Sequence, residues 1–384
     1  MSSVLFVMRY PLHKGDNLSL KFEGQMAAAR VLGHDVFCIG YDEQGLWLCH
    51  GDELTLLLPT HTGRLPGYDK TIFYFHLMAA LKEAFLLRPF DMVYLRFARF
   101  FPGAPKVIRA IKESGCKLIV EHPTYPFESG KTTSFLRRPV LKLCDHVFQQ
   151  IEPMIDLYTL IGQPCGDTLH GIPAMNIVNG VDTELLPLHA PRQEADVGIL
   201  ALASMSRWQG YDRLIEAFGQ YSGKEAYTVH MVGNDYDGSL TQWRERVAAH
   251  HLEEHFIFHG ELFGDELNQI VAKCDIGIGG LGLYRKNQLC SMPLKLREYM
   301  ARGLPFVYAV DDPALSTDMR FCMRVPNDDS IPDAEEILRF AKEMKKDSRA
   351  PEEMRVYARE HMSWVSILKT VFEKVGCSGA DLSE

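Results

Sequence analysis

The chain has 384 residues, of which 46% are hydrophobic and 24% charged, and its formal net charge is −9. This composition is typical of a globular protein, and the length favours two domains over a single core. The acidic balance argues against broad electrostatic binding of nucleic acid, so an anionic ligand must be held by local cations and helix ends.

Targeting and cysteine patterns indicate the cytoplasm. The N-terminal MSSVLFVMRYPL is too short for a signal peptide, and no apolar run is long enough to span a bilayer. The nine cysteines include no CxxC pair, which favours reduced thiols over a disulfide framework or a zinc site. We therefore expect a cytoplasmic protein without a metal site.

Strand and helix patterns alternate through the first half of the chain. An apolar run at 4–8, an amphipathic stretch at 19–32 and a second apolar run at 33–40 predict a βαβ unit. Further strands of one parallel sheet are predicted at 92–97, 117–122, 146–151 and 175–180.

The alternation restarts after a proline-containing linker at 186–196. Strands are predicted, with helices between them, at 197–205, 226–234, 255–262, 275–280 and 306–310. The chain therefore reads as two doubly wound, Rossmann-like α/β domains, 1–190 and 191–360, which face each other across a ligand cleft. The remaining segment, 361–384, holds an amphipathic helix that we expect to pack back across the domain junction.

The stretch GIGGLG at 277–282 matches the dinucleotide fingerprint, but no helix begins inside it. The first strand–helix turn, RYPLHKGDNLS, carries a single glycine, Gly15, which we retain as a ligand-binding candidate. We interpret 277–282 as a wall where the backbone approaches a ligand, and packing at a strand end is an equally open alternative.

The segment SMPLKLREYMARGLPFV at 291–307 carries the main site candidates. Its proline and glycine predict a helix at 294–301, followed by a short buried strand. Lys295 in the first helical turn opposes the helix dipole unless an anion offsets it, and Glu298 suits the paired hydroxyls of a ribose. A solvated lysine and an ordinary first-turn glutamate are the alternatives.

Further candidates follow predicted strands, at the edge where open α/β sheets bind ligands. In the second domain they are Arg207, Gly210, Gly233, Asn234, Arg285 and Lys286. A solvated basic loop is the alternative for the cations, and Asp212 is expected to cap the helix after Gly210. In the first domain His122 is placed to donate to a sugar hydroxyl or a phosphate, with a purely structural histidine as the alternative.

These motifs, in this order, resemble glycosyltransferase family 4, whose members are retaining nucleotide-sugar transferases with a GT-B fold. The resemblance rests on NIVNGVD at 176–182, SRWQGYDRLIEAF at 206–218, HMVGN at 230–234, FHGEL at 258–262 and PLKLREYMARGLPFV at 293–307. It implies a donor site in the second domain that includes Leu262 of FHGEL, an acceptor site in the first domain, and catalysis without a metal.

The chain departs from that family at two places. The family commonly has two glutamates separated by seven intervening residues; the second corresponds to Glu298, but the first position holds Cys290. Many members also carry an Arg and a Lys at the diphosphate, where this chain has Ser204 and Gln209. The candidates to supply that charge instead are Arg207, Arg285, Lys286 and Lys295.

The resemblance implies a metal-independent, retaining hexosyltransferase that uses a nucleoside-diphosphate sugar and no other cofactor. Its acceptor would be a glycan or lipid-linked saccharide in the synthesis of capsule or other surface polysaccharide, and His122, Lys295 and Glu298 are its predicted catalytic residues. A nucleotide-sugar epimerase and a non-catalytic nucleotide-sugar-binding subunit are the alternatives, and a nicotinamide dehydrogenase ranks last. Basic and apolar residues at 81–90 and 135–147 predict either peripheral contact with the inner face of a membrane or plain amphipathic core helices.

Overall fold

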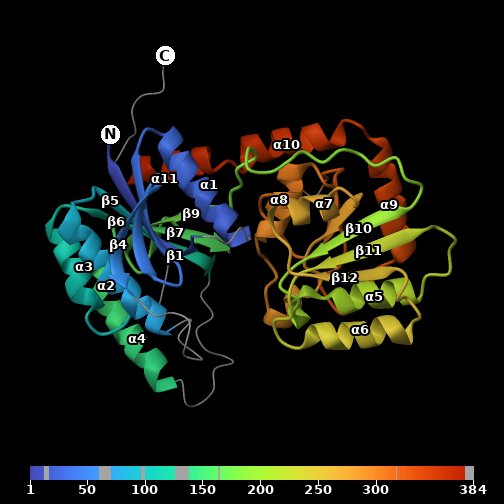
Figure 1. The fold of residues 1–384 in the computed structure, drawn as a ribbon, viewed down its shortest axis with the longest axis horizontal. Helices are drawn as coiled ribbons and strands as arrows, with labels where there is room; N and C mark the ends of the chain where they lie inside the picture. The colour runs from blue at the N-terminus through green and yellow to red at the C-terminus, as the bar shows by residue number, and fades with distance from the viewer. Residues whose placement is uncertain are drawn as a thin grey trace. The chain divides into compact units, whose positions relative to one another are not determined.

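The computed structural model describes residues 1–12, 17–59, 71–96, 100–125, 138–162, 165–316 and 318–376. The chain forms two compact units (Figure 1). The first consists of Met1–Lys14, Phe22–Val178 and Trp364–Glu384, and the second of Gly15–Lys21 and Asn179–Ser363. The predicted domain boundaries at 190 and 360 remain predictions.

The first unit is built on a nine-stranded sheet with the order β4-β3-β2-β1-β5-β6-β7-β9-β8. Its strands are β1 (Ser3–Pro11), β2 (Asp35–Tyr41), β3 (Gly45–His50), β4 (Glu53–Pro59), β5 (Met92–Arg96), β6 (Lys117–Tyr125), β7 (Leu157–Gly162), β8 (Thr168–Leu169) and β9 (Ile172–Asn176). The strands from β2 through β1, β5, β6 and β7 to β9 are parallel, but β3, β4 and β8 pair antiparallel with their neighbours. The predicted parallel sheet is confirmed over these six strands, although β7 and the antiparallel edge strands β3, β4 and β8 were not predicted.

The helices of the first unit cover both faces of this sheet. They are α1 (Asn17–Val31), whose residues up to Lys21 are assigned to the second unit, α2 (Thr71–Leu87), α3 (Ala104–Glu113), α4 (Arg138–Ile151), the short 3-10 helix η2 (Glu152–Met154) and α11 (Trp364–Lys374). Figure 1 shows α2, α3 and α4 along one face and α1 and α11 along the other. The predicted strand at 146–151 is wrong, because it is the end of α4. Its buried residues Cys144, Val147 and Ile151 recur at helical spacing.

The second unit has a six-stranded sheet with the order β12-β11-β10-β13-β14-β15, in which every pairing is parallel. Its strands are β10 (Val197–Leu202), β11 (Tyr227–Val232), β12 (Phe256–Gly260), β13 (Ile276–Ile278), β14 (Phe306–Tyr308) and β15 (Cys322–Arg324). Its helices are η3 (Arg207–Gln209), α5 (Tyr211–Gly219), α6 (Ser239–Ala249), α7 (Gly264–Val271), η4 (Leu283–Lys286), α8 (Leu294–Arg302), α9 (Ala334–Lys346) and α10 (Ala350–His361).

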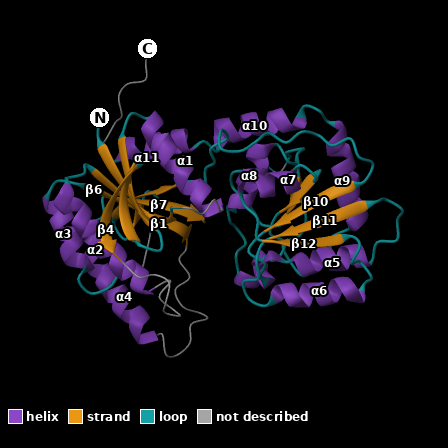
Figure 2. Ribbon diagram, in the orientation of Figure 1, coloured by secondary structure: helices purple, strands orange, loops and turns teal. Residues whose placement is uncertain are grey.

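Successive residues of β10 face opposite sides of this second sheet and enter different cores. Ile199 and Ala201 pack with α5, α6 and α9, whereas Leu200 and Leu202 pack with α7, α8 and α10. Figure 2 shows the helices α5 and α6 on one face and α7 and α8 on the other. The doubly wound prediction is confirmed for this unit. Among the described residues, no helix is long and apolar enough to cross a membrane.

Candidate donor site

The helix α8 places the two main candidates as the sequence predicts. Pro293 precedes the helix with extended ψ, and Gly303 follows it with a φ of 71°. A Cβ on Gly303 would lie 2.5 Å from the backbone of Pro351, so only glycine fits this close approach. Every residue from Lys295 to Arg302 is buried.

The ammonium of Lys295 is held by two neutral oxygens. Its Nζ lies 2.8 Å from Gln209 Oε1 and 3.0 Å from Tyr211 Oη. Burial lowers the pKa of Lys295 from its ordinary value of 10.5 to about 7. Among the residues that the structure describes, no carboxylate pairs with this cation. Lys295 is therefore a buried amine that is about half protonated near pH 7, and a bound anion would favour its charged form.

The contact with Gln209 concerns a position at which the chain differs from the family it resembles. The resemblance expects a lysine at position 209, and here a glutamine side chain ends beside the ammonium of Lys295. A positive charge is thus supplied at the end of the Gln209 side chain from α8.

The glycine-rich stretch 277–282 packs against the protein itself. A Cβ on Gly277 would lie 2.6 Å from the ring of Tyr299, and one on Gly282 would lie 2.9 Å from Gly210. Gly210 has a φ of 70°, and a Cβ there would lie 2.5 Å from the backbone nitrogen of Gly282. These contacts favour the packing alternative for this stretch.

The predicted cation Arg285 is bound within the unit. Its Nη1 and Nη2 each lie 2.8 Å from an oxygen of Asp212, and Nη1 also donates to the carbonyl of Arg207 at 2.8 Å. The hydrogen-bonded carboxylate of Asp212 raises the pKa of Arg285. Asp212 does not cap α5, since Gly210 occupies the N-cap position, so that prediction is wrong. Arg285 joins η4 to the start of α5.

The other two basic candidates lie beside Trp208. The ammonium of Lys286 lies 3.2 Å from the centroid of the Trp208 ring, a cation–π contact. The Arg207 side chain is exposed, while its backbone N–H donates to Asp237 at 3.1 Å. The geometry leaves Arg207 accessible to a ligand.

The remaining second-unit candidates end neighbouring strands, as predicted. Gly233 has a φ of 140°, and a Cβ there would lie 1.6 Å from the carbonyl oxygen of Ala203. Asn234 is exposed and accepts a hydrogen bond from Met205 N–H through its carbonyl at 2.8 Å. Leu262 is half-buried and packs against the core on the α8 side. All three lie at the carboxyl edge of the sheet.

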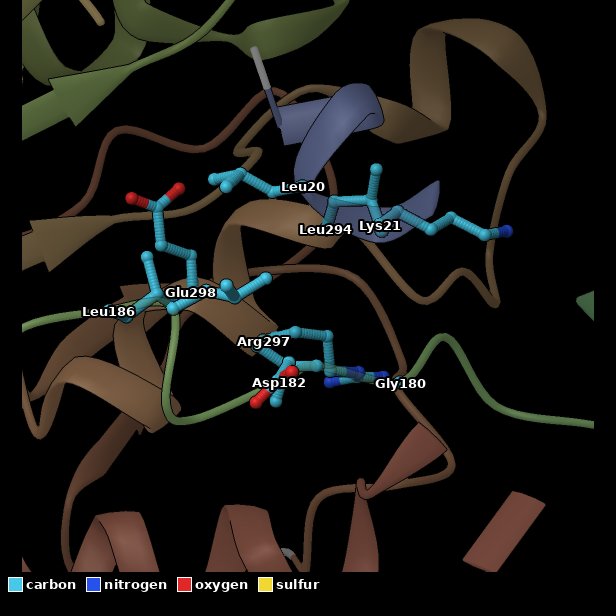
Figure 3. Close-up of a pocket in the computed structure, with 10 residues that line it drawn as sticks. Leu20, Lys21, Gly180, Asp182, Leu186, Leu294, Arg297 and Glu298 are labelled. Atoms are coloured by element: carbon cyan, nitrogen blue, oxygen red, sulfur yellow. The ribbon is translucent and has the colours of Figure 1, made fainter. Parts of the chain in front are cut away.

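Glu298 lines a pocket of the second unit. Its Oε1 accepts a hydrogen bond from Arg302 Nε at 2.8 Å, and its Oε2 is buried. Figure 3 shows its carboxylate directed away from the guanidinium of Arg297. The pocket is lined by Leu20, Lys21, Gly180, Val181, Asp182, Leu185, Leu186, Leu294, Arg297 and Glu298.

Sequence reasoning missed the arginines beside Glu298. Arg297 is almost fully buried, and its Nε donates to the carbonyl of Asn179 at 3.1 Å while its Nη2 lies 2.6 Å from Asp312. It thereby ties the NGVD segment to α8. Arg302 lies four residues after Glu298, and this i, i+4 spacing of opposite charges is a signal that could have found it.

Cys290 occupies the position of the missing family glutamate. It is half-buried and forms an isolated β-bridge with Asp311. Burial raises the pKa of its thiol, so it is neutral at pH 7 and does not replace a carboxylate.

The two first-domain candidates differ in what the structure describes. Gly15 lies outside the described residues. His122, on β6, is 7% exposed, and its ring centroid lies 5.1 Å from that of Tyr158. Burial lowers the pKa of His122 to about 4, so the imidazole is neutral near pH 7. Within the described part of the chain, no three His, Cys, Asp or Glu side chains gather in a way that could hold a metal.

The second unit has a recognisable family sequence. Residues 196–342 match the family model of glycosyl transferases group 1. The matched segment includes η3, η4 and α8, and therefore Lys295 and Glu298. No curated protein matches the chain.

Solved structures share the fold over nearly the whole chain. A sucrose-phosphate synthase from Thermosynechococcus elongatus is 11% identical, with a TM-score of 0.67, over 98% of this chain and 99% of the other. HepE from Anabaena in complex with UDP is 14% identical, with a TM-score of 0.59, over 98% and 100%. A glycosyltransferase from Rickettsia africae is 13% identical, with a TM-score of 0.61, over 97% and 98%. The chain has the GT-B fold, as the sequence predicts.

Proposed function

We propose that this protein is a glycosyltransferase that moves a sugar from a nucleoside-diphosphate sugar to a saccharide acceptor. The family match of residues 196–342 supports this proposal. So does the shared fold of HepE, which has been solved with UDP-glucose and with UDP and glucose. In its finer form, the proposal is metal-independent, retaining transfer of a hexose to a glycan or lipid-linked acceptor in surface-polysaccharide synthesis.

The buried amine of Lys295, which pairs with no carboxylate among the described residues, is the observation that carries the proposal. Buried lysines are normally paired, because an isolated buried charge is costly. Lys295 lies in the first turn of α8, where backbone N–H groups and the helix dipole also favour an anion. A diphosphate at this position would favour the charged form of Lys295.

The chemistry assigns a distinct task to each candidate. In the transfer, the bond between the anomeric carbon and the diphosphate oxygen breaks, and that oxygen keeps the electron pair. The acceptor hydroxyl forms the new bond on the same face of the sugar and passes its proton to that departing diphosphate oxygen. Lys295, with the exposed Arg207, would offset the charge on the departing diphosphate. Glu298 would accept hydrogen bonds from the ribose, and the neutral His122 would hydrogen-bond to the donor sugar.

A panel of UDP-, GDP- and dTDP-sugars tests the proposal by thermal shift and product analysis. A true donor raises the melting temperature by mass action, and a transferase releases the nucleoside diphosphate. An epimerase would change the donor sugar without an acceptor, and a binding subunit would leave it intact. Failure of every nucleotide sugar to bind would contradict the proposal.

We also propose peripheral contact with the inner face of the membrane in the cytoplasm. Large apolar side chains are exposed on α2, at Leu86 and Leu87, and on α4, at Val140 and Leu143. Co-sedimentation with vesicles of phosphatidylglycerol checks this contact, and Leu143→Asp is expected to weaken it. Equal sedimentation of the variant and the native protein would contradict it.

A further inference from the structure

Arg302, in the last turn of α8, holds two side chains from two different helices. Its Nε donates to Glu298 Oε1 at 2.8 Å, and its Nη1 donates to Asn268 Oδ1 of α7 at 2.9 Å. The side chains of Arg302 and Glu298 are 4% and 5% exposed. An ion pair of this spacing on a helix surface contributes little, but here it is buried and fixed from a second helix.

The second carboxylate oxygen of Glu298 lacks a hydrogen-bond donor among the described residues. This oxygen, Oε2, is buried. The nearby pocket residues Leu20, Leu186 and Leu294 offer it apolar side chains. Arg302 binds only Oε1, so Oε2 is a buried carboxylate oxygen that lacks a donor among the described residues. A ligand hydroxyl would supply that donor.

We propose that Arg302 and Asn268 form a brace that fixes the Glu298 carboxylate and presents its Oε2 to the ribose hydroxyls of the nucleotide. The inference rests on the proposed function, since it concerns the same site. Arg302 is a positioning residue, because it acts through Glu298. Without the brace, the glutamate regains its rotamers and loses most of its selectivity for a diol.

Calorimetric titration with UDP and GDP, each paired with its 2′,3′-dideoxy counterpart, tests the brace. In the native protein, the dideoxy ligand is expected to bind about 10-fold more weakly or worse, because hydrogen bonds to a charged acceptor are lost. In Arg302→Gln this ratio is expected to fall toward one, while the dideoxy ligand binds as before. A merely structural defect would weaken both ligands equally. Arg302→Lys is expected to retain part of the ratio.

A second variant and a matched control complete the test. Asn268→Ala keeps the ion pair between Arg302 and Glu298 but removes the hydrogen bond that holds Arg302 to α7, so a smaller fall in the affinity ratio is expected. If Arg302→Gln does not fold, Asn268→Ala is the variant that tests the brace. The control is Arg349→Gln, which breaks an i, i+4 pair with Glu353 whose arginine is 81% exposed. Its ratio is expected to equal that of the native protein.

The possible failures are distinguishable. A native ratio near one, or an unchanged ratio in the deciding variant, overturns the brace and leaves the proposed function standing. Failure of the native protein to bind either UDP or GDP overturns both.

Discussion

Replacing Lys295 by methionine should make the protein more stable and much less active. Methionine has a similar length and no charge, so the substitution removes a buried amine with little change in packing. The same substitution removes the positive charge that we assign to the diphosphate. Loss of one such preorganised group typically lowers turnover by about 10²–10³-fold.

The expected gain in stability follows from the pKa of Lys295, which burial lowers from 10.5 to about 7. The unfolded chain binds a proton that the folded chain gives up, so the cost is fully present below pH 7 and disappears as the pH rises through 10.5. At pH 7 it amounts to about 4 kcal/mol. Loss of the two hydrogen bonds to Gln209 and Tyr211 destabilises the variant by about 1 kcal/mol each and so offsets part of this gain. The free energy of unfolding of Lys295→Met should therefore exceed that of the native protein by about 2 kcal/mol.

Urea denaturation at pH 7 and pH 10 measures this difference. At pH 10 the cost of burial is only about 1 kcal/mol, so the variant should become less stable than the native protein. Lys346→Met, at an exposed position of α9, is the matched control and should show no such change. A Lys295→Met variant that is equally destabilised at both pH values would refute the lowered pKa of the buried Lys295 amine. Native turnover in that variant would refute its catalytic role.

Three further predictions concern the surroundings of the site and the stability of the fold. Gly210→Ala, at a φ of 70° and against Gly282, should lower the free energy of unfolding by about 2 kcal/mol in urea, whereas Gly166→Ala, which faces open space, should change it little. Arg285→Met should lower the free energy of unfolding by about 3 kcal/mol in the same measurement. Its affinity for the donor should fall no further than that of Asp212→Asn. A larger fall would indicate that Arg285 binds the phosphates. Burial lowers the pKa of both His189 and His230 from 6.5 to about 4. Between these pH values the unfolded chain binds a proton at each imidazole that the folded chain does not, so the free energy of unfolding should fall by up to about 3 kcal/mol per histidine. In denaturation measured across this pH range, His189→Gln should reduce the loss of stability at low pH. An unchanged loss in this variant would show that His189 is not buried in its neutral form.

Most of the second unit was predictable because four of its six strands, β11, β10, β13 and β14, are interior and parallel, whereas the edge strand β15 was not predicted. Such strands are buried on both faces, so they read as continuous apolar runs, and each predicted run from 197–205 to 306–310 contains an observed strand. The helix α8 was found from its flanking Pro293 and Gly303, since proline and glycine act locally on the backbone.

The edges of the first sheet were not found, because turn chemistry decides them. Asp42 Oδ1 accepts the backbone N–H groups of Gln44 and Gly45, which turns β2 back into the antiparallel β3. A parallel pattern read from apolar runs alone overlooks this reversal. The end of α4 was misread for a related reason, since a short apolar run such as HVFQQI fits a strand or a buried helical turn.

At the site, the sequence predicts where the candidate side chains lie in their helix, but it does not predict which side chains they contact. The positions of Lys295 and Glu298 in α8 follow from the helix pattern. However, Lys295 meets Gln209 across 86 residues, and Arg285 meets Asp212 across 73. Whether a cation is paired with a carboxylate depends on residues that are distant in the sequence and come into contact only in the folded chain.

The position of the diphosphate relative to Lys295 tests the central claim most directly. A crystal structure of the protein with a bound nucleoside-diphosphate sugar should place a phosphate oxygen about 2.7–2.9 Å from Lys295 Nζ. A diphosphate bound elsewhere, with Lys295 still held only by Gln209 and Tyr211, would contradict the account.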